Sequence, residues 1–308
     1  MKAEEVREAK RSLVERHGAW RGYNLRLADD VYTMSPGLVG AAELNIARVL
    51  QIVSDHAPKP LAQLRMLDLG AHEGGFTIEF ACHGARVRSI EGREGHVAKA
   101  RFAAQCLGLD NVEITQGDVR DLSRDRDGGF DVVLCLGILY HLSPDDVHPF
   151  LARVASVCDG FTLIETNISL TRKLTVETTA GELKGRLSRE NVRHAGAALD
   201  SSPSFWPTRA SLLNLFAAVG FTSVSECLNP PVLATAALSD HATYLAVKRP
   251  PVAARAAPQV NSLDPSIWRW PEAMRPRPSP ANDRRVALAD RFRTMLGTSV
   301  AQRIRRKS

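Results

Sequence analysis

A regular alternation of short apolar runs with amphipathic stretches dominates the chain between residues 65 and 165. The runs have the length and composition of buried strands, and the stretches between them have helical periodicity. Apolar strands joined by helices form parallel βαβ units whose sheet is covered on both faces. We therefore expect an α/β, Rossmann-like fold. The predicted strands are 65–69, 86–90, 112–116, 132–136 and 160–165, and the predicted helices are 75–83, 94–107 and 145–156, with a weaker one at 119–123.

Further predicted elements flank this alternation. Residues 1–18 and 41–57 have helical patterns, and 208–220 predicts a helix capped by a threonine and stopped by a glycine. Two strand candidates, 221–228 and 243–248, follow with no helix between them, so we expect an antiparallel pair at the sheet edge. The predicted domains are an N-terminal helical or lid segment (1–60), a core (61–249) with a substrate insertion (168–207), and a C-terminal extension (250–308).

Two of these regions lie outside the predicted sheet. The insertion 168–207 contains a predicted hairpin that turns at Ala180–Gly181, and long segments beside a ligand crevice often act as lids or substrate platforms. The extension is rich in proline and basic, with 13 Lys and Arg against 4 Asp and Glu from Arg249 onward. Because the whole chain carries +6, this excess of +9 leaves −3 for the rest. Such a tail can meet RNA, a phosphate-bearing glycan or a membrane surface, or remain a solvated extension.

Bulk composition disfavours membrane and secreted classes. The longest apolar run, 132-VVLCLGIL-139, is strand-sized and far shorter than a transmembrane helix. The first 18 residues mix both charge signs and lack the apolar centre of a signal peptide. The five cysteines are scattered without paired zinc-ligand spacing, which suits reduced thiols. These features predict a cytoplasmic protein without a transmembrane segment.

The turn after the first predicted strand, 66-MLDLGAHEGGFT-77, has the form of a nucleotide-binding turn. Gly70 and Gly75 are in register with the dinucleotide fingerprint, but His72 holds the place of the middle glycine. That glycine lets the backbone approach a pyrophosphate, so His72 argues against NAD. Asp68 is expected at the crevice floor, where it can orient backbone that faces the ligand or reach an amine.

Two more acids close the next two strands. Glu91 ends the second strand, where a carboxylate accepts hydrogen bonds from both ribose hydroxyls in dinucleotide folds. Asp118 follows the third strand in 117-GDV-119. Because ligands of such sheets bind beyond the carboxyl ends of the strands, the three acids together predict a nucleoside site.

Several motifs resemble those of class I methyltransferases that depend on S-adenosylmethionine (SAM). The pattern D-x-G-x-x-x-G at Asp68, Gly70 and Gly74 is similar to motif I of this class. The stretch 135-CLGILYHLSPDD-146 is similar to the segment after the fourth strand, most closely in the branch that contains tRNA wobble-uridine carboxymethyltransferases. Three further stretches resemble segments of the same branch: 20-WRGYNLRLADDVYT-33, 163-LIETNI-168 and 205-FWPTRASLLNLFAAVGF-221.

The resemblance implies a seven-stranded methyltransferase sheet and SAM as cofactor, with S-adenosylhomocysteine (SAH) as product. SAM carries an ammonium group and no pyrophosphate, which agrees with the turn described above. The class also implies that Asp118 bonds the adenine amino group. Where the tRNA branch has basic residues after its Tyr-His pair, this chain has 142-LSPDD-146, which favours plain methyl transfer over carboxymethyl transfer. The predicted cofactor-binding residues are Asp68, Gly70, His72, Gly74, Glu91, Asp118 and Gly137.

The acceptor side is expected near Tyr140 and His141. Histidine titrates near neutrality, so His141 can take a proton from an acceptor hydroxyl as the methyl group arrives, or it can merely cap the next helix or fill the wall. Tyr140 can pack on the cofactor or bond to it. Glu165 and Asn167 can orient the acceptor; two oxygen residues do not make a metal site, so we predict no metal, although a divalent ion is possible. Tyr23 and Trp206 complete the predicted substrate residues.

Together these features predict a SAM-dependent methyltransferase that acts on a hydroxyl of a small polar acceptor, such as a sugar, glycan or natural product. The first alternative is a tRNA-modifying methyl- or carboxymethyltransferase whose basic tail contacts nucleic acid. The second is a non-catalytic SAM-fold partner whose segment 284–308 docks a protein or a membrane. The retained acids disfavour this last alternative, and the oligomeric state stays open.

Overall fold

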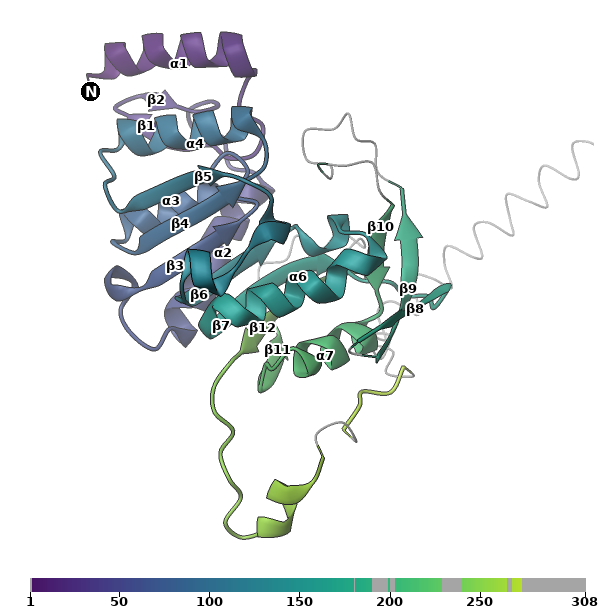
Figure 1. Cartoon of the computed structure of the whole chain (residues 1–308). Coiled ribbons are helices and arrows are strands. Elements are labelled where there is room, and N and C mark those ends of the chain that lie inside the picture. Colours follow the sequence, from purple (N-terminus) through teal and green to yellow (C-terminus); the bar gives the residue numbers. More distant parts are fainter. Residues whose placement is uncertain are drawn as a thin grey trace, which may run out of the picture. The chain divides into compact units, whose positions relative to one another are not determined.

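A seven-stranded sheet forms the centre of the computed structural model (Figure 1). The structure describes residues 2–179, 181–189, 199, 203–228, 240–264 and 268–272. The chain divides into two compact units, Met1–Arg269 and Trp270–Ser308, and all elements below belong to the first. The predicted docking segment 284–308 lies outside the described residues.

The strand order is β11-β12-β7-β6-β3-β4-β5. Neighbouring strands are parallel from β7 through β5, whereas β12 pairs antiparallel with β7 and with the edge strand β11. Both the five parallel strands and the antiparallel pair at the edge are therefore confirmed. The bounds are β3 Arg65–Leu69, β4 Arg86–Glu91, β5 Val112–Gln116, β6 Phe130–Leu136, β7 Cys158–Asn167, β11 Ser223–Glu226 and β12 His241–Val247.

Helices cover both faces of the sheet because alternate strand residues point to opposite sides. Leu67 and Val133 belong to the core cluster beneath α6 and α7, whereas Met66 and Val132 belong to the cluster beneath α2 and α3. The weaker predicted helix at 119–123 is a short 3-10 turn, η2, followed by the single-turn α5. The bounds are α2 Ala41–His56, η1 Leu61–Gln63, α3 Gly75–Cys82, α4 Glu94–Cys106, η2 Val119–Asp121, α5 Arg124–Asp127, η3 Leu139–His141, α6 Pro144–Val157, α7 Arg209–Ala218 and η5 Pro258–Ser262.

Local sequence fixes where the last two major helices begin and end. Ser143 caps α6 by accepting a hydrogen bond from the backbone of Asp146, and Thr208 caps α7 in the same way. Gly220, with φ +98°, follows the end of α7 and turns the chain toward β11. The predicted helix over 208–220 is confirmed with its cap.

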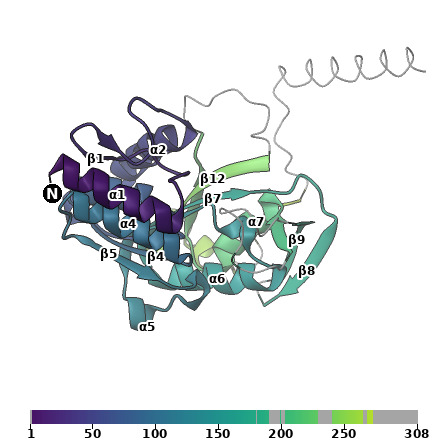
Figure 2. The same cartoon turned by 90° about the horizontal axis from the view of Figure 1, so that it is seen from above.

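The insertion forms a small sheet of its own beside α6 and α7 (Figure 2). Its strands are β8 Leu174–Thr178, β9 Gly181–Ser188 and β10 Ser204–Pro207, all paired antiparallel. The predicted hairpin is confirmed, although Ala180 at its turn lies outside the described residues; the third strand was not predicted. Leu183 and Phe205 point into the main core, so this platform is anchored to the sheet.

The N-terminal segment packs over α4. Its elements are α1 Ala3–His17 and the short hairpin of β1 Arg26–Ala28 and β2 Val31–Tyr32 (Figure 2). Val6 and Leu27 share a third core cluster with Val97 of α4. Among the described residues, no helix combines the length and apolar character needed to cross a membrane.

Candidate active site

A cavity of about 290 Å³ lies at the carboxyl ends of β3, β4, β5 and β6, where the strand order reverses. This is the position at which open α/β sheets bind their ligands. Eight of the residues predicted from sequence line it: Tyr23, Gly70, His72, Glu91, Asp118, Gly137, Tyr140 and His141. The structure thus brings together side chains from four strand ends and the N-terminal segment.

The turn after β3 uses its backbone donors internally. The amides of Gly70 and Ala71 donate to the carbonyl oxygen of Ile90, at 2.8 and 3.4 Å, and the amide of His72 donates to Glu91 Oε2 at 2.8 Å. Gly70 has φ +64° and His72 has φ +51°, both in the left-handed region. A pyrophosphate needs free amides in such a turn, so this loop is not built as a phosphate cradle.

The Glu91 carboxylate is buried and fixed in orientation. Besides the His72 amide, it accepts a hydrogen bond from the Arg93 amide at 2.9 Å and lies 3.4 Å from His96 Nδ1. Burial alone would raise the pKa of Glu91, but the hydrogen bonds from His96 and the two amides hold it below the ordinary value. An ionised carboxylate has about four lone-pair sites, and these three contacts use three of them, so Glu91 Oε2 can still accept a hydrogen bond from one ribose hydroxyl.

Three potential metal ligands, His72, Glu73 and His96, meet behind the turn, with ligand atoms within 4.8 Å of one another. The rings of the two histidines lie 4.0 Å apart, and burial together with the neighbouring His96 lowers the pKa of His72 to about 4, so its ring is neutral. The Glu73 carboxylate, however, already binds Lys99 Nζ at 2.9 Å. The Lys99 ammonium group thus already supplies a positive charge to these three residues, so they do not require a metal ion.

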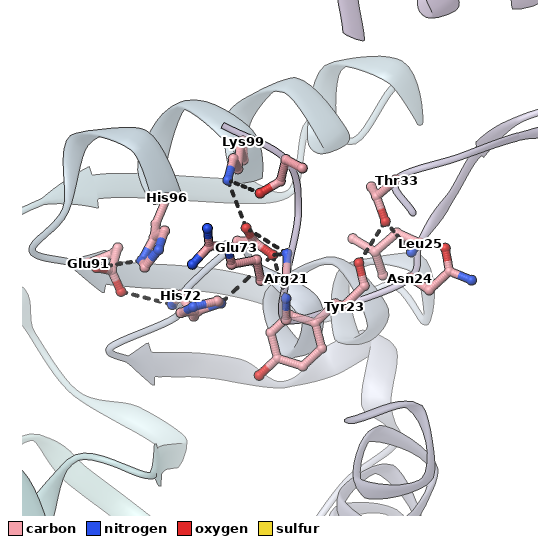
Figure 3. A network of polar contacts seen from close by, with 12 residues as sticks. Arg21, Tyr23, Asn24, Leu25, Thr33, His72, Glu73, Glu91, His96 and Lys99 are labelled. Carbon is pink, nitrogen blue, oxygen red and sulfur yellow. Dashed lines mark hydrogen bonds and ion pairs between the residues drawn. The ribbon is translucent and has the colours of Figure 1, made fainter. Parts of the chain in front are cut away.

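The Glu73–Lys99 pair also ties the N-terminal segment to the site (Figure 3). Glu73 accepts hydrogen bonds from the amides of Arg21 and Gly22, and Lys99 donates to the Ala19 carbonyl oxygen at 2.9 Å. Glu73 is 1% exposed and the Lys99 side chain 5%. A buried pair with these extra bonds holds residues 19–22 firmly against the turn.

Tyr23 follows directly and lines the cavity (Figure 3). Its ring lies so close to Gly75 that a Cβ there would be 2.4 Å from it. Burial, followed by the nearby carboxylates of Asp68 and Glu165, raises the pKa of Tyr23. The phenol therefore stays protonated and can donate a hydrogen bond into the site.

Asp118 lines the cavity beside a residue that sequence reasoning missed. Its carboxylate binds Arg120 Nη2 at 2.6 Å and accepts from the Arg120 amide at 2.8 Å. Arg120 also reaches Asp146 at 3.4 Å. The cavity wall thus carries a cation between two acids, which holds Asp118 in place. The missed lining residues with polar side chains are Arg93, His96, Arg120 and Ser143. His96 is the third residue of α4, the helix that follows Glu91, and this nearness to Glu91 in the sequence was its only signal.

Two predicted cofactor residues lie behind the lining. Asp68 is 2% exposed and accepts a hydrogen bond from Thr77 Oγ1 at 2.7 Å, so it fixes the start of α3 beneath the turn and does not face the crevice. Burial raises the pKa of Asp68 to about 7. Gly74, with φ +88°, precedes α3, and a Cβ there would lie 2.7 Å from the Ala100 Cβ. Close helix packing therefore accounts for the glycine.

Tyr140 and His141 stand on η3 at the other wall of the cavity. Their rings lie 4.2 Å apart, and the Trp206 ring meets Tyr140 edge-on at 6.4 Å. The Phe205 amide donates to the Leu142 carbonyl oxygen at 2.8 Å, which joins β10 to η3. Trp206 is not part of the lining; it belongs to the platform strand β10 and lies behind Tyr140.

Glu165 and Asn167 lie at the end of β7 and are bridged by a histidine that sequence reasoning missed. His241 Nε2 is 3.3 Å from Glu165 Oε1, and its Nδ1 is 2.9 Å from Asn167 Oδ1. Asn45 donates to Glu165 Oε2 at 3.1 Å. The antiparallel pairing of β12 places His241 opposite Asn167, which sequence spacing alone does not reveal. This cluster adjoins Tyr23 but is outside the cavity lining.

Comparison with known proteins agrees with the fold. Residues 66–159 match the family model described as "Methyltransferase domain". The N-terminal domain of EvdMO1, crystallised in the presence of SAH and D-fucose, superposes with a TM-score of 0.64 at 23% identity, covering 82% of this chain and 98% of that domain. The family match identifies a methyltransferase domain over residues 66–159, and the superposition shows that the chain shares the fold of the EvdMO1 domain.

Two groups of curated relatives are similar over part of the chain. The ubiquinone biosynthesis O-methyltransferase of Acinetobacter baumannii is 34% identical over 85 residues, which are 28% of this chain and 35% of that protein. The 23S rRNA (uracil(1939)-C(5))-methyltransferase RlmD of Shewanella halifaxensis is 39% identical over 85 residues, 27% of this chain and 19% of that protein. The first of these matches thus spans about a third of its relative's length. Residues 66–159 thus match a methyltransferase domain, and the fold of the chain is that of the EvdMO1 domain; the tRNA wobble-uridine branch stays a prediction.

Proposed function

We propose that this protein transfers the methyl group of SAM to a hydroxyl of a small polar acceptor such as a sugar, glycan or natural product. The observation that supports this most is one cavity with two chemically different walls. One wall presents Glu91 and Asp118 at the ends of β4 and β5, and the other presents Tyr140 and His141. A nucleoside and a reacting hydroxyl can be held there side by side.

On this proposal the first wall binds the nucleoside. Glu91 Oε2 accepts a hydrogen bond from a ribose hydroxyl, and Asp118 accepts one from the adenine amino group. Gly70 and Gly137, with φ of +64° and +84°, allow the backbone to turn close to the ligand. SAM, when bound, supplies an activated methyl group. Tyr23 closes the site from the N-terminal side.

The second wall positions the acceptor and moves the proton. His141 takes the proton from the acceptor hydroxyl, so that the oxygen attacks as an alkoxide-like nucleophile. Tyr140 packs between the reacting centre and Trp206 and excludes water. Methyl transfer of this kind depends mainly on holding the two reactants in line, which a walled cavity provides. One group of curated relatives is named as O-methyltransferases and the other as rRNA methyltransferases. RNA is therefore the second candidate acceptor.

The RNA candidate draws on the basic tail, most of which lies outside the described residues. Against it, the chain before Arg249 carries a net −3, whereas nucleic-acid sites are basic. The small polar acceptor is therefore preferred. The five cysteines, all unpaired in the structure, support the cytoplasm as the proposed location.

The test is methyl incorporation from labelled SAM into an extract of the native host cells. We expect His141→Ala to lower incorporation about 10²- to 10⁴-fold, the range of a lost general base. The control is His83→Ala, which changes the exposed C-cap residue of α3 that pairs with Glu79, and it should match the wild type. Label that resists RNase supports the small acceptor, and label lost to RNase supports the RNA alternative. Full activity of His141→Ala would refute the proton-transfer role.

A further inference from the structure

We propose that the acceptor carries a negatively charged group, a carboxylate or a phosphate, and that Arg186 binds it. This inference rests on the proposed function and narrows the class of acceptor. It comes from a cation on the platform that is held in a fixed orientation, close to the aromatic residues of the acceptor wall.

Arg186 lies on β9 and stacks on the Trp206 ring of β10. Its guanidinium carbon is 3.8 Å from the ring centroid, and the two residues are direct partners in the strand register. Both side chains are half-buried. Stacking on an aromatic face fixes the guanidinium plane and leaves its N–H groups at the edge, directed away from the ring.

The guanidinium has no carboxylate partner among the residues that the structure describes. The neighbouring cation of the same strand differs, since Lys184 Nζ binds Glu182 at 3.0 Å. Arg209 of α7 is likewise paired, with Glu226 at 2.8 Å. A half-buried, oriented guanidinium with no carboxylate partner in the described part of the chain offers the donor fork that carboxylates and phosphates bind bidentately.

The position of Arg186 fits an acceptor that spans from the cavity to the platform. Trp206 meets Tyr140 edge-on at 6.4 Å, and Tyr140 packs at 4.2 Å from His141. Arg186, Trp206, Tyr140 and His141 therefore form a continuous row. An acceptor whose hydroxyl lies at His141 can extend along this row and place a charged group at Arg186.

The charge of the platform agrees with this. Residues 168–189 contain five Lys and Arg and two Glu, whereas the chain before Arg249 as a whole carries −3. Residues 168–189 thus carry a local net charge of +3 within the part of the chain that is acidic as a whole. Such local excess attracts anionic ligands and raises their concentration near the site.

The platform is rigid enough to hold the cation in place. Leu183 and Phe205 are 2% and 0% exposed and belong to the main core cluster. The Lys184 amide donates to Ser211 Oγ at 2.8 Å, and the Thr208 amide donates to the Lys184 carbonyl oxygen at 2.7 Å. These contacts fasten β9 at Lys184, two residues before Arg186, to α7 and its cap, and the pairing of Arg186 with Trp206 holds the stacked pair in the small sheet.

The experiment compares the wild type, Arg186→Gln and Arg189→Gln, the last being an exposed arginine at the end of the same strand. Each protein is incubated with methyl-labelled SAM and host extract, and labelled products are separated on an anion exchanger at neutral pH. SAH affinity of each protein is measured separately by calorimetry. We expect labelled product in the retained fraction. At limiting extract, Arg186→Gln should yield about tenfold less retained label than the wild type, whereas Arg189→Gln should yield the same amount. The SAH affinity should be the same for all three proteins.

Two treatments of the retained product distinguish a carboxylate from a phosphate. Loss of retention at pH 2 identifies a carboxylate, and loss of retention after phosphatase identifies a phosphate. Label only in the unretained fraction, or retained label that Arg186→Gln does not reduce, overturns the inference while the methyltransferase proposal stands. Failure of the wild type to label any product, with SAH bound normally, overturns the proposed function and this inference with it.

Discussion

The two walls of the cavity are built in different ways. The cofactor wall consists of the ends of β3, β4 and β5, three strands that follow one another in the chain. Its acids are held by backbone amides and by residues close in sequence, as in the Asp118–Arg120 pair. The acceptor wall is formed by η3, and behind it lie β10, β7 and the distant β12. There, aromatic rings and the Glu165–His241 contact between separate segments define the surface.

This difference determines how many substitutions each wall can tolerate. Changes in the cofactor wall disturb buried charges and the turn itself, so they are expected to affect folding and cofactor affinity together. The acceptor wall is carried by an anchored platform whose outward side chains can change without disturbing the sheet. Loops and additions on a rigid scaffold are where substrate choice commonly resides.

The largest stability effect is expected at the Glu73–Lys99 pair beside the cofactor wall. Lys99→Met leaves the Glu73 carboxylate buried without its cation, which costs about 3–5 kcal/mol of the free energy of unfolding. Urea titration measures this loss. As the matched change near the acceptor wall, Arg209→Met breaks a more exposed pair with Glu226 and should cost only about 1 kcal/mol.

A double variant separates charge from packing. Lys99→Met combined with Glu73→Gln removes both charges, so it should recover most of the stability lost by Lys99→Met alone. Equal losses for the Lys99 and Arg209 variants would contradict the distinction between the two walls. No recovery in the double variant would show that the packing of the lysine stem, not the buried charge, dominates.

A smaller effect is expected from Asp68 beneath the turn. Its pKa of about 7 in the folded protein lies above the value of about 3.9 in an unfolded chain, so the folded state binds the extra proton between these values. Its contribution to stability is therefore complete below pH 4 and is lost as pH rises through 7. Between pH 5 and pH 8 the loss amounts to about 2–3 kcal/mol.

Asp68→Asn keeps an acceptor for the Thr77 hydroxyl but cannot ionise. We expect the variant to lack this part of the pH dependence, so that it is more stable than the wild type at pH 8 and similar to it at pH 4. Chemical denaturation at the two pH values measures the difference. An unchanged slope in the variant would mean that Asp68 is already ionised at neutral pH and hydrated in the folded protein.

The cofactor wall was largely predictable from the sequence, and the acceptor wall was not. Glu91 and Asp118 follow apolar runs whose parallel pairing is forced by the intervening helices, so their shared edge could be inferred. Asp68 was placed on the wrong side of the turn, since strand alternation does not show that Thr77 would bind it from below. Sequence gives the neighbours along a strand but not the partner of a buried carboxylate.

On the acceptor wall, the contacts depend on segments far apart in the chain. The pairing of β10 with β9 brings Trp206 to Arg186, and the return of β12 brings His241 to Glu165. Neither register follows from local periodicity, because antiparallel pairing across a long connection leaves the register to side-chain packing. Trp206 and Glu165 could be predicted as site residues from the sequence, but their contacts with Arg186 and His241 could not.

The central claim is that the cavity at the strand ends binds the nucleoside of SAM through Glu91. Calorimetric titration of SAH into the wild type, Glu91→Gln and the exposed control Glu113→Gln tests it directly. We predict micromolar binding to the wild type and the control, and binding about 10- to 100-fold weaker to Glu91→Gln, since hydrogen bonds to a charged acceptor are lost. Absence of SAH binding to the wild type, or equal affinity of Glu91→Gln, would contradict the account.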